Sequence, residues 1–265
     1  MLSIEEIKLL IEKLERVKKE DLQELIDSNL KILKDLELAV DANNNEVIDR
    51  LDKTPEWFRK DLEQKEKNPI VDPALEKFVQ SKIFQFAKTN IYNSLEIGPG
   101  TGMFSMDFRA WRSNFFIDVL SDREEVIRRK FNTRHHKYLK FYTTRNTECT
   151  NIPQGSCNLV FSWDTFVFFT QQHVRQYLHD IKRVLIPGGY CLIQYADCHY
   201  DQELDLAKRG YWNYNTKTAM TQMIKDEGYE VVEMNQFRPG ASYAIFKKPG
   251  KQNPVVYKVS EITLD

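Results

Sequence analysis

The chain has 265 residues, with 38 basic and 39 acidic side chains and a formal net charge of −1. Because these charges balance, no overall positive field attracts a polyanion, so we do not expect a nucleic-acid substrate. No apolar run approaches the roughly 18 residues that a membrane-spanning helix needs, and we expect no membrane partner. A hydrophobic content of 42% supplies a packed core, and the length allows one α/β domain with an appendage.

Cysteine and histidine spacing gives no sign of a metal site. The four cysteines, Cys149, Cys157, Cys191 and Cys198, contain no C-x-x-C pair, and no histidines accompany them at zinc spacing. We therefore expect reduced thiols, mostly buried in strands, and no metal. The first residues lack the basic start and apolar stretch of a secretory signal, so we expect a cytoplasmic location.

Residues 1–90 contain no glycine and are rich in Leu, Ile, Lys and Glu, a composition that favours helix. Ser3 and Glu6 fit a capping box, and apolar side chains then recur at helical spacing over 4–14 and 22–40. This pattern predicts a helical hairpin or one long helix. Its apolar stripes are suited to a coiled-coil homodimer, and equally to packing on each other or on the rest of the chain.

Two further helices are expected before residue 90. One begins at Thr54 with Pro55 and the other at Asp72 with Pro73, because in each pair a capping side chain precedes a proline at the first helical position. We therefore predict a helical appendage over residues 1–90.

From residue 91 onward, strand-like runs alternate with amphipathic segments, which indicates βαβ units and a mostly parallel sheet. The expected strands lie near residues 92–97, 115–120, 139–143, 158–163, 189–195, 229–235 and 241–247. Only residues 237–240 separate the last two, too few for a parallel crossover, so these two should form an antiparallel hairpin. The predicted class is α/β, with a sheet domain over 91–248 and a tail over 249–265.

A glycine-rich turn follows the first expected strand. It comprises Glu96, Gly98, Pro99, Gly100, Thr101 and Gly102. Glycine is needed where the backbone takes positive φ or where a ligand approaches too closely for a Cβ atom. Met103 stands where a dinucleotide fingerprint has its third glycine, which disfavours a dinucleotide. The pattern acidic-x-Gly-x-Gly-x-Gly instead resembles motif I of the class I S-adenosylmethionine-dependent methyltransferases. The resemblance implies that the glycines make room for the methionine part of the cofactor and that Glu96 helps hold its amino group.

Further matches to that family follow in chain order. Asp118, about 20 residues after the first glycine, resembles the acid of motif II and is expected to accept hydrogen bonds from the ribose hydroxyls. Asp122 is the rival for this role, and either acid could instead cap the next helix. Glu148 and Cys149 resemble the pair of motif III that reads the adenine edge, although Glu148 is also consistent with an ordinary loop carboxylate.

The stretch from Tyr177 to Tyr190 resembles the helix, Pro-Gly-Gly turn and fifth strand of small-molecule members of the family. Pro187 is expected to end the helix, and Gly188 with Gly189 to allow a tight entry into the strand. Together the matches cover residues 93–195. They imply a seven-stranded Rossmann-like methyltransferase sheet whose last strand is antiparallel.

Ser162, Trp163 and Asp164 are expected at the end of the fourth strand, where ligands of open α/β sheets bind. Ser162 and Trp163 are candidates for binding the cofactor, and Asp164 is expected to face the transferred methyl group. These residues do not form the Asp/Asn-Pro-Pro-Tyr signature of methyltransferases that act on amino groups of bases or glutamine. Three candidates for a general base are Asp164, His173 and His199, with His199 ranked slightly above His173 because it follows the fifth strand. Each histidine is also consistent with a solvated position away from the site.

Other side chains near this region are candidates for the walls of the site. The aromatic candidates are Phe166, Phe168, Phe169, Tyr195, Tyr200, Tyr211, Trp212 and Tyr214, which are equally consistent with ordinary core. Trp57, Phe58 and Arg59 are candidates for a lid over the cofactor.

These observations predict S-adenosylmethionine-dependent methyl transfer to a small molecule. O-methylation of a sugar, nucleotide-linked or capsule-type metabolite is the first expectation, and N-methylation of a small amine is left open. Aminopropyl transfer from a decarboxylated cofactor, and a non-catalytic cofactor-binding subunit that acts through its N-terminal helices, are the alternatives.

Overall fold

The computed structural model describes residues 56–67, 72–86, 93–108, 113–144 and 147–251. The chain divides into two compact units, Met1–Asn45 and Glu46–Asp265. The first unit, with the expected capping box and apolar stripes, lies outside the described residues, as do Thr54 and Pro55. Among the residues described, no helix combines the length and apolar character needed to cross a membrane.

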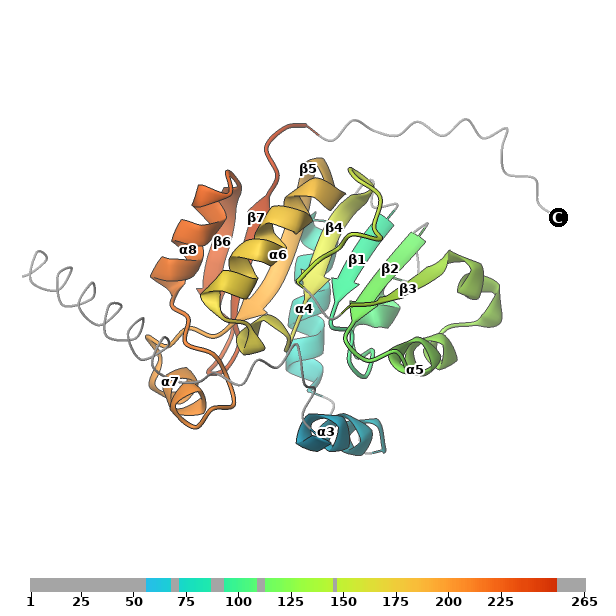
Figure 1. Cartoon of the computed structure of the whole chain (residues 1–265), viewed down its shortest axis with the longest axis horizontal. Coiled ribbons are helices and arrows are strands. Elements are labelled where there is room, and N and C mark those ends of the chain that lie inside the picture. Colours follow the sequence, from blue (N-terminus) through green and yellow to red (C-terminus); the bar gives the residue numbers. More distant parts are fainter. Residues whose placement is uncertain (1–55, 68–71, 87–92, 109–112, 145–146, 252–265) are drawn as a thin grey trace, which may run out of the picture. The chain divides into compact units, whose positions relative to one another are not determined.

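Seven strands form one sheet in the order β3-β2-β1-β4-β5-β7-β6 (Figure 1). The strands are β1 Asn93–Ile97, β2 Ser113–Asp118, β3 Leu139–Thr143, β4 Cys157–Ser162, β5 Leu185–Tyr195, β6 Glu230–Gln236 and β7 Ser242–Lys247. β7 runs antiparallel to both of its neighbours, whereas the pairs among β1 to β5 are parallel. The predicted seven-stranded Rossmann-like sheet with an antiparallel last strand is confirmed.

Helices cover both faces of this sheet. The α-helices are α3 Glu56–Lys67, α4 Pro73–Phe86, α5 Arg123–Lys130, α6 Gln171–Val184, α7 Asp201–Lys208 and α8 Lys217–Asp226, with short 3-10 helices η1 Ser105–Phe108, η2 Thr133–Tyr138 and η3 Phe166–Phe168. Residues of α6 and α8 share a core with Leu95 and Ile97, and residues of α4 share a second core with Leu159 and Phe161. Because side chains alternate along a strand, the two cores lie on opposite faces of the sheet.

The start of α4 follows from its capping residue. Asp72 Oδ1 accepts hydrogen bonds from the backbone N–H groups of Ala74 and Leu75, each at 3.0 Å, which confirms the expected cap. One helical turn apart, Val79 and Ile83 are fully buried against the sheet. Helix α4, part of the expected helical appendage, therefore packs into one of the two cores of the sheet.

The junction between α6 and β5 differs from the prediction. The helix ends at Val184 and the strand begins at Leu185, so Pro187 does not end the helix. Leu185 is fully buried with extended backbone, and this burial fixes the start of the strand before the proline is reached. The register of β4 against β5 then shifts, and Gly188 takes a φ of +77° at that irregularity. The Pro-Gly-Gly segment is thus a bulge within the strand.

None of the four cysteines forms a disulfide and all four are buried, which agrees with the expected reduced thiols, although two of them rather than most lie in strands. Cys157 lies in β4 and Cys191 in β5, while Cys149 and Cys198 lie in loops. Burial raises the pKa of Cys157 to about 12 and that of Cys191 well above its ordinary value, so these thiols stay protonated. Within the described ranges, no group of three or more His, Cys, Asp and Glu side chains is arranged to hold a metal ion.

Candidate active site

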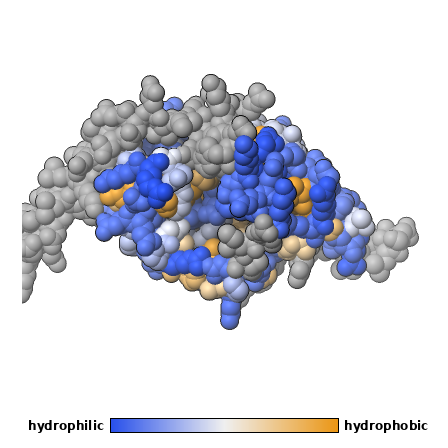
Figure 2. Space-filling model, turned by 90° about the horizontal axis from the view of Figure 1, so that it is seen from below, coloured by the Kyte–Doolittle hydropathy of each residue, from blue (hydrophilic) through white to orange (hydrophobic). Residues whose placement is uncertain are grey.

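A cavity of about 490 Å³ lies at the carboxyl ends of β1, β2 and β4, beneath α3. Ligands of open α/β sheets bind at this edge, and the volume falls within the range of pockets that enclose small ligands. Figure 2 views the molecule from the side of these strand ends, where hydrophilic residues cover most of the coloured surface. The cavity is therefore the first place to look for the predicted site residues.

The glycine turn forms one wall of the cavity, through Gly98, Pro99, Gly100 and Thr101. Gly98 and Gly100 have φ values of +68° and +53°, which L side chains rarely adopt. A Cβ atom on Gly98 would lie 2.1 Å from Thr165 Oγ1, so no side chain fits there. Gly102 does not line the cavity. A Cβ atom there would point away from it and lie 2.4 Å from Ile127 Cδ1 of α5, so this glycine allows the helix to pack against the turn.

Glu96 lines the cavity from the opposite side of its strand to the α6 core. Its side chain is buried and accepts a hydrogen bond from Ser105 Oγ at 2.6 Å. Burial raises the pKa of Glu96 to about 8, although the bond from Ser105 partly opposes this shift. The carboxyl group is thus protonated over much of the neutral range and is able to donate as well as accept a hydrogen bond.

Asp118, at the tip of β2, also lines the cavity. It accepts hydrogen bonds from the backbone N–H groups of Leu120 at 2.9 Å and Gly100 at 3.4 Å. Burial raises its pKa to about 6, and these bonds oppose the rise. Asp122, the rival, does not line the cavity and instead forms ion pairs with Arg59 at 3.1 Å and Arg123 at 3.0 Å. Of the two acids, only Asp118 lines the cavity.

Asp164 has a left-handed backbone with φ +56°, the one such value outside glycine among the described residues. Its backbone N–H donates to Gln194 Oε1 at 2.7 Å, and Gln194 Nε2 donates to Gly240 O at 2.9 Å, which fixes this conformation. The side chain opens into the cavity, whose walls displace water and so raise the pKa of the carboxyl group. Trp163 lines the cavity as well, whereas the hydroxyl of Ser162 is turned into the sheet and donates to Ile97 O at 2.8 Å.

The two candidate histidines do not line the cavity. His173 sits in the first turn of α6, where its backbone N–H donates to Thr170 Oγ1 and its ring contacts the edge of Phe169. His199 Nδ1 lies 3.1 Å from the buried carboxylate of Asp197. Among the three candidate bases, Asp164 is the one that faces the cavity.

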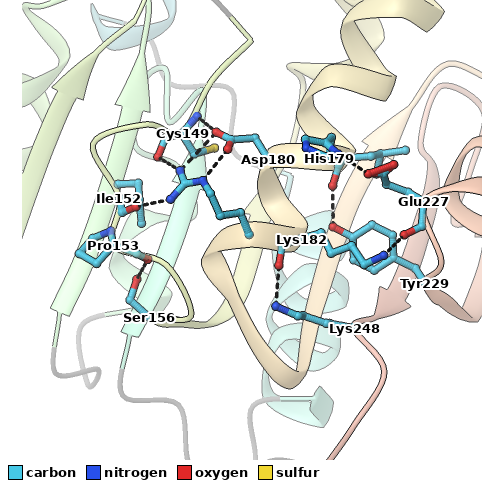
Figure 3. A network of polar contacts seen from close by, with 12 residues as sticks. Cys149, Ile152, Pro153, Ser156, His179, Asp180, Lys182, Glu227, Tyr229 and Lys248 are labelled. Carbon is cyan, nitrogen blue, oxygen red and sulfur yellow. Dashed lines mark hydrogen bonds and ion pairs between the residues drawn. The ribbon is translucent and has the colours of Figure 1, made fainter.

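Glu148 and Cys149 also lie outside the cavity lining. Glu148 is exposed, and the backbone N–H of Cys149 donates to the carboxylate of Asp180 on α6 (Figure 3). Arg183 bonds Asp180 at 2.7 Å and the carbonyl oxygen of Cys149 at 2.6 Å, so this segment is anchored to α6. Thr144, just before residues 145–146 that the structure does not describe, is the residue of this loop that lines the cavity.

Helix α3 covers the cavity and forms its roof, but through other residues than the lid residues expected from the sequence. Leu62 is buried and would lie 3.6 Å from a Cβ atom on Gly100, and Asp61 and Lys65 line the cavity beside it. Of the three expected lid residues, Arg59 pairs with Asp122 outside the cavity, and the side chains of the other two lie outside the described residues. Only the helical pattern of α3 was readable from the sequence, because its cover over Gly100 is a tertiary contact.

Three of the aromatic candidates, Phe168, Phe169 and Trp212, line the cavity. The other five lie outside its lining: Phe166, Tyr195 and Tyr214 are buried, and Tyr200 and Tyr211 are exposed. Arg238, in the turn between β6 and β7, was not foreseen; it lines the cavity and forms an ion pair with Asp72. No motif marked Arg238, since its role depends on a contact with a residue 166 positions earlier in the chain.

A family model described as a methyltransferase domain matches residues 43–234. The chain belongs to the methyltransferase-domain family. It is a class I S-adenosylmethionine-dependent methyltransferase, as the glycine turn and the order of the strands indicated. No curated protein matches the chain.

Solved structures of this fold resemble the methyltransferase over most of their length. The N-methyltransferase NodS from Bradyrhizobium japonicum WM9, in complex with S-adenosyl-L-homocysteine, has a TM-score of 0.57 at 17% identity, covering 72% of this chain and 97% of that one. A SAM-dependent methyltransferase from Aquifex aeolicus has a TM-score of 0.52 at 16% identity, covering 71% and 96%. The [4+2]-cyclase SpnF has a TM-score of 0.52 at 10% identity, covering 66% and 81%. At such identities the likeness shows the fold alone.

Proposed function

We propose that this methyltransferase transfers a methyl group from S-adenosylmethionine to a small-molecule acceptor bound in the cavity beneath α3. One observation carries the proposal: the glycine turn, Asp118 and Asp164 all face the same cavity of about 490 Å³. A donor held along the turn and an acceptor beside Asp164 would then share one cavity, which is what a direct displacement requires.

The residues of the turn fit the donor. At Gly100 the nearest atom to the Cβ position is Leu62 Cδ2 at 3.6 Å, so a ligand has room beside this backbone, whereas the Cβ position of Gly98 is filled by Thr165. Asp118 offers carboxylate oxygens beside Gly100 N. In our proposal, Asp118 holds the ribose hydroxyls and Glu96 faces the amino-acid end of the donor. The bound donor supplies a methyl group on a positively charged sulfur. Glu148 and Cys149 remain candidates for binding the adenine, but this assignment has less support because neither residue lines the cavity.

Asp164 is our candidate for the residue that faces the acceptor and takes its proton. Methyl transfer is an in-line displacement, so the enzyme chiefly aligns the nucleophile and removes a proton. A carboxylate with a raised pKa is a better proton acceptor than an ordinary one, and that of Asp164 is raised because the cavity walls displace water. Its fixed left-handed backbone supports a functional role, since such conformations persist where the surroundings hold them.

The nature of the nucleophile is the finer part of the proposal. The sequence alone favours a hydroxyl acceptor of the sugar, nucleotide-linked or capsule type, with an amine as the alternative. A hydroxyl acceptor needs a base to take its proton, and two of the three candidates, His173 and His199, lie outside the cavity lining. A hydroxyl acceptor therefore has less support from the structure than from the sequence. The charge of the cavity is the better guide to the class of acceptor.

The test is a transfer assay with the full chain, methyl-labelled S-adenosylmethionine and a small-molecule extract of the cells that carry the gene. We expect label in a small product. Asp164→Asn should slow its formation about 100-fold or more while leaving the affinity for S-adenosylhomocysteine unchanged, since asparagine tolerates the same backbone. The control is Asp226→Asn, which removes an exposed carboxylate that pairs with Arg175 at 3.0 Å on the surface. Full turnover by Asp164→Asn would refute its role.

Three further expectations also stay proposals. We propose a cytoplasmic protein and a homodimer formed through the helices expected before residue 45. The molar mass with and without residues 1–45 tests the dimer, and an unchanged monomer would exclude it. The non-catalytic alternative would bind S-adenosylhomocysteine without transferring label in the assay above.

A further inference from the structure

The charges that face the cavity are unequal. Of the described residues, five carboxyl groups line it, from Asp61, Asp72, Glu96, Asp118 and Asp164, against two cations, Lys65 and Arg238. Both cations are already paired, Lys65 with Asp61 at 2.8 Å and Arg238 with Asp72. An acceptor with a phosphate or carboxylate group would therefore meet a surplus of negative charge and no cation without a carboxylate partner.

The excess negative charge of the cavity lies at two carboxylates, Asp118 and Asp164. Glu96 is largely protonated near neutral pH, because burial raises its pKa to about 8. Asp118 sits at the tip of β2, where the backbone N–H groups of Leu120 and Gly100 donate to it. Asp164 follows the end of β4, and its backbone N–H donates to the side chain of Gln194. At the acceptor side of the cavity, the direct ion pairs of Lys65 and Arg238 are with Asp61 and Asp72 rather than with Asp164, although both cations lie near enough to Asp164 to lower its pKa, against the larger rise caused by burial.

Aromatic side chains line the same cavity as Asp164. Trp163 precedes Asp164 in the chain, and Phe168 and Trp212 line the same space. Ring faces carry partial negative charge and attract ammonium groups, at about 0.5 to 2 kcal/mol for each contact. A carboxylate among aromatic rings is an environment that favours an organic cation over a neutral or anionic molecule of the same shape.

We propose that the acceptor is a small amine, held as its ammonium form by Asp164 and the surrounding rings and methylated on nitrogen. This inference rests on the proposed function and names its substrate class. The ammonium gives one proton to the Asp164 carboxylate, and the freed nitrogen lone pair forms a bond to the methyl carbon. The carbon–sulfur bond breaks with its electron pair on sulfur, so the products are a methylated amine and S-adenosylhomocysteine.

Three probes of one shape and different charge test the preference: benzylamine, benzyl alcohol and benzoate. Their affinities for the full chain, saturated with S-adenosylhomocysteine, are measured by ligand-observed NMR titration at neutral pH. We expect benzylamine to bind about tenfold more tightly than the other two, equivalent to about 1.4 kcal/mol. Asp164→Asn should remove this preference, and the surface variant Asp226→Asn should keep it.

Equal binding of the three probes, or a preference that survives in Asp164→Asn, would overturn the amine assignment while leaving the methyltransferase proposal intact. If S-adenosylhomocysteine does not bind the wild-type chain at all, the proposed function fails and the amine assignment fails with it. In the transfer assay, the labelled product should be retained on a cation exchanger. A neutral or anionic product methylated on oxygen would contradict the inference and support the hydroxyl alternative.

Discussion

Among the glycines that the structure describes, Gly98 has the least space for a side chain. Its φ of +68° disfavours any L side chain, and a Cβ atom would lie 2.1 Å from Thr165 Oγ1. Gly155 has a similar φ of +58° but no atom within 4 Å of the Cβ position, so it separates backbone strain from collision. We expect Gly155→Ala to cost about 1 to 2 kcal/mol in the free energy of unfolding. Gly98→Ala should cost about 3 kcal/mol or more. Urea denaturation measures both, and equal losses would contradict the packing at Thr165.

Glu96 gives a prediction for pH. Its pKa is about 8 in the folded chain against 4.5 in the unfolded chain, because burial disfavours the carboxylate. Between these values the unfolded chain releases a proton that the folded chain keeps, so stability falls as pH rises from 4.5 to 8. Glu96→Gln removes this loss. The free energy of unfolding of the variant minus that of the wild type should therefore rise by roughly 3 to 5 kcal/mol between pH 4.5 and 9, at about 1.4 kcal/mol per pKa unit. A gap that does not change with pH would show that Glu96 is not buried as described.

At the scale of elements, α3 is held over the cavity by ion pairs to the start of α5. Arg123 has a side chain only 4% exposed; it pairs with Glu66 of α3 and lies 3.5 Å from the carbonyl oxygen of Gly100. A ligand beneath α3 therefore leaves more easily when this contact is weakened. Glu66→Gln should speed the dissociation of S-adenosylhomocysteine about fivefold in a stopped-flow chase, since such a bond contributes on the order of 1 kcal/mol. Glu63→Gln, an exposed change on the same helix, is the control, and equal rates for the two variants would argue against a roof role.

The sequence predicted those elements whose signals are local. The expected strand at 139–143 coincides with β3, and the cap at Asp72 lies where Asp precedes Pro. The α6–β5 junction was misjudged, because the burial of Leu185 outweighs the local tendency of Pro187 to end a helix. In the site, the turn and Asp118 were predicted by spacing along two adjacent strands. The roof by Leu62 and the pairing of Arg238 were not, since both depend on contacts between distant segments.

At the scale of the whole molecule, a parallel sheet with one antiparallel strand brings the ends of β1, β2 and β4 to one edge. This arrangement joins residues from the glycine turn, the tip of β2 and the loop after β4 around one cavity. Residues of α3 and of the turn between β6 and β7 also line this cavity. The site is therefore a product of the topology, and a single ligand spanning Asp118 and the glycine turn is its expected occupant.

Calorimetric titration of the full chain with S-adenosylhomocysteine tests this account most directly. We predict one bound molecule per chain, and an affinity at least tenfold weaker in Asp118→Ala, because the variant loses charge-assisted hydrogen bonds to the ribose. Glu125→Ala removes an exposed carboxylate paired with Arg129 and should bind as the wild type does. Absence of binding to the wild-type chain, or equal affinities for Asp118→Ala and Glu125→Ala, would contradict the assignment of the cavity as the cofactor site.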